Sequence, residues 1–185
     1  MRIAPIAPVA PNVSAAPTAA TAPIQLPPVS PAGASSPAEI VSHRYTRDLL
    51  AINGVASTSY SNRVADELTI GVEDTRAAAV LAGLIRPVVD GVRLTIVPRD
   101  TNAPYTGPAA TSVAARVRAV AAMNGVWNYY YTGLGQANAR VTFETVDQPT
   151  IDRIKSLIVD KFVAGVDDYG NPRVVEMTWR VRLPQ

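Results

Sequence analysis

Two spacings of hydrophobic residues alternate along the chain. From residue 37 the apolar positions recur every three or four residues, which predicts a helix with a buried side at Val41, Tyr45, Leu49 and Ile52. Ser36 and Glu39 form a capping box in front of this helix, and Asn53-Gly54 ends it. The two stretches that follow, 55–61 and 68–72, are typical of strands, the second because apolar and polar residues alternate.

A second helix and a third strand complete this pattern. Asp74 is a suitable N-cap, and the positions after it predict a helix with Val80, Leu81, Leu84, Ile85 and Val88 on its buried side. Asp90-Gly91 predicts a turn, and residues 92–98 alternate as a strand. Because β–α–β connections are right-handed, we expect the second and third strands to be parallel neighbours.

The same order of elements follows once more. A helix is predicted over 109–124, with Arg116 and Arg118 on its solvent side, and strands over 126–132 and 140–146. A helix capped by Asp147 and a last strand over 175–183 come next, and the helix would bury Ile151, Ile154, Leu157, Ile158 and Phe162. "INGV" at 52–55 and "MNGV" at 123–126 mark the two helix-to-strand corners, 71 residues apart. We interpret the repeat as a duplication, and chance similarity of two αββαβ units is the alternative.

The predicted fold class is therefore α+β, built from two tandem αββαβ units. Each unit would have a three-stranded sheet with two helices on one face. The units occupy residues 37–98 and 109–185, with a linker at 99–108 and an extended Pro/Ala-rich arm at 1–36. The outer sheet faces should be polar and mixed in sign.

The stretches "INGV", "LTIGVED" and "DGVRLTIVP" place Gly-Val pairs around predicted strands. In this placement and in the order of elements, residues 37–185 resemble BON domains and the ring-building motifs of bacterial secretion and sporulation rings. The resemblance implies an assembly or attachment module rather than an enzyme.

The arm is rich in proline and almost without charge. Residues 1–36 hold one Arg and no acidic residue, and nine of the 16 prolines lie before residue 38. Such a segment is extended and partly polyproline II. It is either a disordered spacer or an arm that lies along another subunit. Apolar side chains that are unusual in a solvated linker favour the arm, namely Ile3, Ile6, Val9, Ile24 and Leu26.

Composition narrows the candidate chemistry. The chain has 17 basic and 15 acidic residues without a concentrated basic patch, so no nucleic-acid surface is indicated. It has no cysteine and one histidine, His43, so we expect no metal site, no cofactor and no catalytic triad. Prolines interrupt the apolar N-terminus, and no stretch is long enough for a membrane span. We expect a cytoplasmic or virion-associated protein with no signal peptide, no transmembrane segment and no membrane partner.

The strongest functional candidate is the aromatic stretch "WNYYY" at 127–131, where the first unit has "ASTSY" at 56–60. Strand alternation places Trp127, Tyr129 and Tyr131 on one face and Tyr130 on the other. Packing in the core would explain these residues. A protein-contact patch is the functional alternative, because Trp and Tyr are frequent interface anchors.

These observations predict a non-enzymatic structural or assembly protein. Its arm would dock on neighbouring protein subunits of an oligomer or large complex, and a virion or another shell is a setting that suits extended apolar arms. The alternative is a small-ligand-binding or sensory module that uses the groove between the two units.

Overall fold

A computed structural model describes residues 35–61, 64–133 and 138–182. The described part confirms the α+β class. Its first half contains α1 (Pro37–Ala51), β1 (Val55–Ser61), β2 (Val64–Val72), α2 (Thr75–Leu81), β3 (Val88–Val89) and β4 (Val92–Pro98). Its second half contains α3 (Val113–Ala121), β5 (Val126–Thr132), β6 (Asn138–Thr145), α4 (Gln148–Leu157), β7 (Lys161–Val166) and β8 (Pro172–Val181). The arm candidates Ile3, Ile6, Val9, Ile24 and Leu26 lie outside the described residues.

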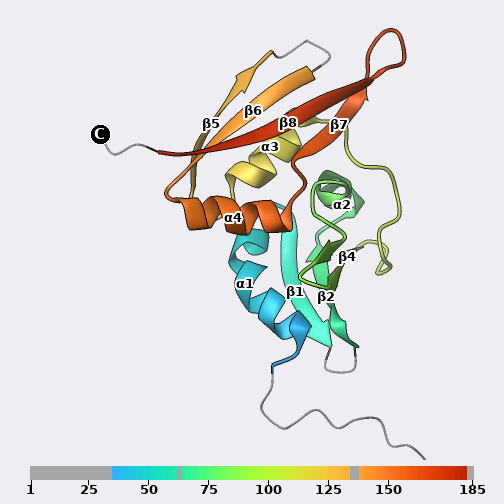
Figure 1. The fold of residues 1–185 in the computed structure, drawn as a ribbon. Helices are drawn as coiled ribbons and strands as arrows, with labels where there is room; N and C mark the ends of the chain where they lie inside the picture. The colour runs from blue at the N-terminus through green and yellow to red at the C-terminus, as the bar shows by residue number, and fades with distance from the viewer. Residues whose placement is uncertain (1–34, 62–63, 134–137, 183–185) are drawn as a thin grey trace, which may run out of the picture. The chain divides into compact units, whose positions relative to one another are not determined.

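Each half forms a four-stranded sheet, so the prediction of three strands is wrong. The strand orders are β1-β2-β4-β3 and β5-β6-β8-β7. β2 and β4 are parallel, as are β6 and β8, which confirms the expected crossover. The remaining neighbours are antiparallel. Figure 1 shows α3 and α4 on one side of the second sheet.

The additional strands lie where the sequence pattern predicted helix. α2 ends at Leu81 and α4 at Leu157, so Val88 and Phe162 are on β3 and β7 and not on helices. Gly83, with φ 65°, turns the chain after α2. Asp90 and Gly91, with φ 50° and 81°, then form the tight turn that returns β3 into β4. Apolar spacing alone does not distinguish a long helix from a short helix followed by a buried hairpin.

The two halves repeat each other in detail. Gly54 and Gly125 have φ of 88° and 86°, and an added Cβ would lie 2.8 Å from Ala77 in the first half and 2.9 Å from Thr150 in the second. Both corners therefore require glycine. The pairing also shifts by one residue at Ala56 and at Trp127, which gives each first strand the same β-bulge.

One hairpin is longer in the second half. Leu68 pairs with Leu94, and the equivalent Val141 pairs with Met177. The first members of these pairs are 73 residues apart and the second members 83, so the second half has ten additional residues in its β7–β8 hairpin. Exposed Val163, Val166 and Tyr169 lie on this insertion.

The halves meet through equivalent residues. Ile85 and Ile158 form an antiparallel bridge. Around it the Arg86 amide donates to the carbonyl of Leu157, and the Val159 amide donates to the carbonyl of Leu84, both at 2.9 Å. Each amide thus bonds the counterpart of the residue two positions before it, which is the pattern of an approximate two-fold axis. One hydrophobic core is continuous across both halves.

An ion pair between the buried Asp48 and the half-buried Arg153 also joins the halves. Asp48 on α1 is 1% exposed. Its carboxylate accepts from Nε and Nη2 of Arg153 on α4, at 2.8 and 3.2 Å, and from the Asn124 amide at 3.0 Å. Arg153 donates in addition to the carbonyl of Asn124 at 2.6 Å. Asp48 is therefore fully engaged across the interface.

Arg116 is not on the solvent side of its helix as predicted. It is 1% exposed and donates from Nε to the carbonyl of Val80 at 3.4 Å and from Nη2 to the carbonyl of Ala82. Its guanidinium also lies 4.6 Å from the centre of the Phe162 ring. Burial lowers the pKa of this guanidinium, although the group stays charged. Arg118, two residues further on and thus on the opposite side of the helix, is exposed as expected.

Candidate protein-contact surface

The four aromatic candidates on β5 divide into two pairs. Tyr129 and Tyr131 point toward the core and are partly buried, with ring centres 5.7 Å apart in an edge-to-face arrangement. Tyr129 also lies 6.1 Å from the Phe143 ring, which stacks on Trp179 at 4.9 Å. Burial raises the pKa of Tyr131, and its neighbour Tyr129 adds to this effect. These two tyrosines therefore belong to the core of the second half.

Trp127 and Tyr130 are exposed on the opposite face, with exposed fractions of 62% and 38%. The prediction that Trp127 shares a face with Tyr129 and Tyr131 is wrong. The β-bulge inserts Trp127 as an extra residue between the pairs Val126–Thr145 and Asn128–Glu144. An extra residue shifts the alternation by one position, and this brings Trp127 to the face of Tyr130.

Arg180 on β8 and Arg182, directly after this strand, cover these rings. The Arg182 guanidinium lies 4.2 Å from the centre of the Trp127 ring, and that of Arg180 lies 5.0 Å from the Tyr130 ring. Figure 1 shows β5 and β8 on either side of β6, so both contacts cross the middle strand. Cation–π contacts of this kind stabilise exposed sites by about 0.5–1 kcal/mol. They hold the aromatic rings in defined positions.

Glu144 on β6 fixes one of the two arginines. Its carboxylate accepts from Arg180 Nε at 2.9 Å and also contacts Arg180 Nη2. The hydrogen bond from Arg180 holds the pKa of Glu144 below its usual range, and Glu144 in turn raises the pKa of Arg180. We call Trp127, Tyr130, Glu144, Arg180 and Arg182 the Trp127–Tyr130 patch.

The first sheet has no counterpart of this patch. Ala56 and Ser59 replace the two aromatic residues, and Gly71 and Val97 replace Glu144 and Arg180. Arg99 corresponds to Arg182 but has no tryptophan beside it. An added Cβ on Gly71 would lie 2.4 Å from Ser57 Oγ, so this position does not accept a glutamate without rearrangement. The patch is therefore specific to the second half.

Elsewhere the two outer faces are alike. Thr142 and Thr178 are hydrogen-bonded at 2.8 Å, where the first sheet pairs Thr69 with Thr95. Arg140 and Glu176 form a salt bridge at 3.0 Å, where the first sheet pairs Glu67 with Arg93 and so exchanges the charges. The polar outer faces expected from the sequence are confirmed at these positions.

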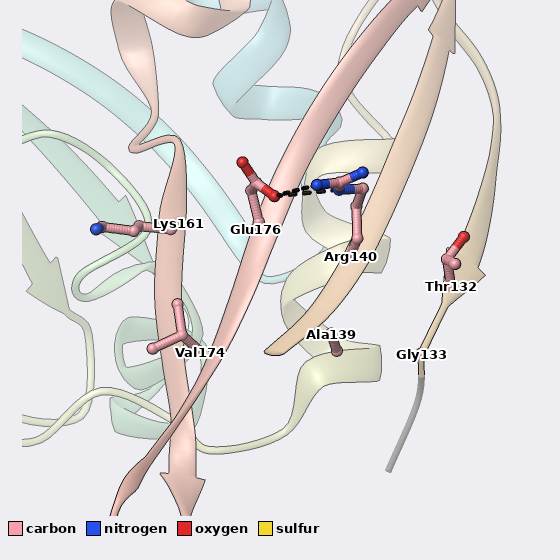
Figure 2. Close-up of a pocket in the computed structure, with 7 residues that line it drawn as sticks. All are labelled: Thr132, Gly133, Ala139, Arg140, Lys161, Val174 and Glu176. Carbon is pink, nitrogen blue, oxygen red and sulfur yellow. Dashed lines mark hydrogen bonds and ion pairs between the residues drawn. The ribbon is translucent and has the colours of Figure 1, made fainter. Parts of the chain in front are cut away.

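A shallow depression of about 490 Å³ lies at the other end of the second sheet. Figure 2 shows that Arg140 and Glu176 face each other across β6 and β8, while the amino group of Lys161 points away from them. The depression is lined by Thr132, Gly133, Ala139, Arg140, Lys161, Val174 and Glu176. Because Arg140 and Glu176 neutralise each other, the depression offers few groups to a ligand.

The chain's one histidine, His43, is exposed and lies 3.7 Å from Glu39. Over residues 35–61, 64–133 and 138–182 there is no group of three or more His, Cys, Asp or Glu side chains placed to hold a metal ion. In the same ranges, no helix combines the length and the apolar character needed to cross a membrane.

No family model, curated protein or solved structure matches the chain.

The sequence pointed to the aromatic strand but missed its partners. Arg180 and Arg182 were expected only as members of a polar face, and Glu144 likewise. Arg180 and Arg182 are two positions apart, and in extended chain this spacing places both side chains on the same face of the sheet. The spacing could therefore have indicated that they lie together. The bulge is also needed, because regular alternation along β5 would place Trp127 on the face opposite to Tyr130.

Proposed function

We propose that this chain is a non-enzymatic structural or assembly protein whose N-terminal arm docks on neighbouring subunits of a large complex, with a virion or another shell as one suitable setting. The observation that carries this proposal is the Trp127–Tyr130 patch. The described residues already bury a continuous core without Trp127 and Tyr130. An exposed Trp-Tyr pair between arginines has the composition of an interface anchor.

The arm has the reach and the composition for such docking. In a polyproline II conformation, at about 3.1 Å per residue, the 34 residues before Ser35 would span roughly 100 Å. Their only charged side chain is Arg2, and they offer apolar side chains at Ile3, Ile6, Val9, Ile24 and Leu26. A preformed extended segment loses little conformational entropy on binding.

Removal of residues 2–34 tests the proposal. Ser36 is retained because its hydroxyl caps α1, accepting from the Glu39 amide at 3.1 Å. We expect the shortened chain to keep the far-ultraviolet circular dichroism and the cooperative melting of the full chain, and to sediment as a monomer. The full chain should sediment as an oligomer.

The control for this deletion replaces residues 2–34 by a Gly/Ser segment of the same length. It should be as monomeric as the deletion, because the proposal assigns docking to the arm's side chains and not to its length. Assembly that survives the deletion contradicts the proposal.

A second candidate function is the binding of a small ligand between the halves. A groove of about 470 Å³ lies there, within the usual range for ligand pockets. It is lined by Ala51, Ile52, Asn53, Val80, Ala115, Arg118, Ala119 and Ala122. Most of these side chains are small and apolar, and Arg118 is the one charged group among them, so the chemistry suits an apolar anion.

The apolar anionic dye 1-anilinonaphthalene-8-sulfonate is a suitable probe of this groove. If the groove binds such ligands, the native chain should enhance the dye's fluorescence, and Arg118→Gln should weaken dye binding roughly tenfold by removing the cation. Arg44→Gln is the matched control, since Arg44 is exposed and pairs with Asp90 away from the groove. An equal effect of both substitutions, or no binding by the native chain, rules this function out.

A further inference from the structure

The first residues of the arm contain a three-residue repeat. Residues 3–11 read Ile-Ala-Pro, Ile-Ala-Pro and Val-Ala-Pro. A polyproline II helix has three residues per turn, so in this conformation each position of the repeat forms its own edge. One edge carries Ile3, Ile6 and Val9, and another carries the three prolines. The segment contains no charged side chain.

The Trp127–Tyr130 patch has a spacing that suits such a helix. Trp127 and Tyr130 are three positions apart on β5, which corresponds to roughly 8–10 Å along the strand because the bulge at Trp127 shortens the first step. Successive turns of polyproline II are about 9 Å apart. Two neighbouring triplets would therefore meet the two aromatic rings in register, and aromatic-lined surfaces are the usual receptors of proline-rich segments.

The charges of the patch also favour a neutral partner. Arg180 is paired with Glu144, and Arg182 lies on the Trp127 ring. The guanidinium groups thus position the rings, and the patch does not form a basic groove that tracks phosphates. Trp127 is still 62% exposed with Arg182 in place, which leaves ring surface open to a partner.

From these observations we propose that residues Ile3–Pro11 of one copy dock on the Trp127–Tyr130 patch of a second copy. This inference rests on the proposed assembly function and names the segment and its receptor. Each chain has one such segment and one patch, because the first sheet carries Ala56 and Ser59 at the aromatic positions. Two copies can therefore exchange their segments reciprocally in a closed dimer, or pass them on head-to-tail to build rings or filaments.

Self-association of the full chain, measured by sedimentation velocity over a concentration series, tests this docking. One variant alters the receptor with Trp127→Ala and Tyr130→Ser, the residues that the first half already carries. A second alters the segment with Pro5→Ala, Pro8→Ala and Pro11→Ala. Each should weaken self-association by roughly tenfold to a hundredfold, in line with the loss of an interface anchor.

Matched controls separate docking from folding. Tyr60→Ser removes a tyrosine of similar exposure, 37%, from β1, and Pro17→Ala with Pro23→Ala removes prolines outside the repeat. Both controls should associate like the native chain. All variants should keep the native melting temperature within a few degrees, because Tyr60, Trp127 and Tyr130 are exposed and the core of the described residues is built without residues 1–34.

A mixing experiment decides whether the contact is between copies. The receptor variant still has an intact segment, and the segment variant still has an intact patch. Mixed in equal amounts, they should form a one-to-one complex that neither forms alone. Failure to form this complex overturns the inference.

Three further outcomes would contradict the proposed docking of the segment on the patch. If the receptor variant assembles like the native chain while the deletion of residues 2–34 does not, the arm docks elsewhere, and only the proposed function stands. If a 20-residue oligothymidylate binds the native chain and the receptor substitutions abolish that binding, the patch is a nucleic-acid surface. Assembly without the arm removes both proposals together.

Discussion

Arg116→Ala should lower the free energy of unfolding by about 3–5 kcal/mol, the range for large buried side chains truncated to alanine. Arg116 is among the largest fully buried side chains of the described residues. Its removal leaves a cavity beside the Phe162 ring and deprives the carbonyls of Val80 and Ala82 of their donor. An unpaired buried acceptor adds to the loss.

Urea unfolding followed by circular dichroism measures this difference. Arg118→Ala is the matched control, because it removes the same side chain from an exposed position on the same helix and should change the stability by no more than about 0.5 kcal/mol. Equal effects of the two substitutions would show that Arg116 is not buried between the halves.

Asp48→Ala should cost about 2–4 kcal/mol, because it removes the buried partner of an ion pair and leaves the half-buried Arg153 without its carboxylate. Arg153 would keep the carbonyl of Asn124 as its remaining protein acceptor, and the Asn124 amide would lose its acceptor. Since the pair joins α1 to α4, the loss weakens the contact between the two halves.

Asp160→Ala provides the control for this variant. Asp160 also pairs across the halves, with Arg86 at 3.3 Å, but both side chains are exposed. An exposed pair contributes about 0–1 kcal/mol, so the control should unfold close to the native chain in the same urea titration. The double variant Asp48→Ala, Arg153→Val should regain much of the lost stability, because it removes both charges of the pair. Without such recovery, the cost of Asp48→Ala does not come from the stranded charge.

Local signals in the sequence predicted much of the fold. Asp74 and Asp147 cap their helices as expected, each accepting from an amide three residues on at 2.8 Å. The bounds of β5 and β4 agree with the alternation of the sequence. These features depend on side chains that act within a few residues of their own position, so a single sequence contains the required information.

Other features depend on the tertiary structure and were missed. Val88 and Phe162 have helical spacing, yet each pairs with a following strand, and that pairing partner is not visible in the spacing itself. Arg116 has the charge of a surface residue, but the carbonyls that accept its hydrogen bonds are in the other half of the chain. The bulge at Trp127 arises from the pairing of β5 with β6, and it decides which aromatic side chains reach the surface.

The Asp48–Arg153 pair affects which halves can pair favourably with each other. By the 71- and 73-residue offsets, Asp48 corresponds to Ala119 and Arg153 to Val80. If the first half paired with a copy of itself, Asp48 would face Val80 and find no cation. If the second half did so, Arg153 would face Ala119 and find no anion. The Asp48–Arg153 pair therefore favours contact between the two unlike halves over contact of either half with a copy of itself.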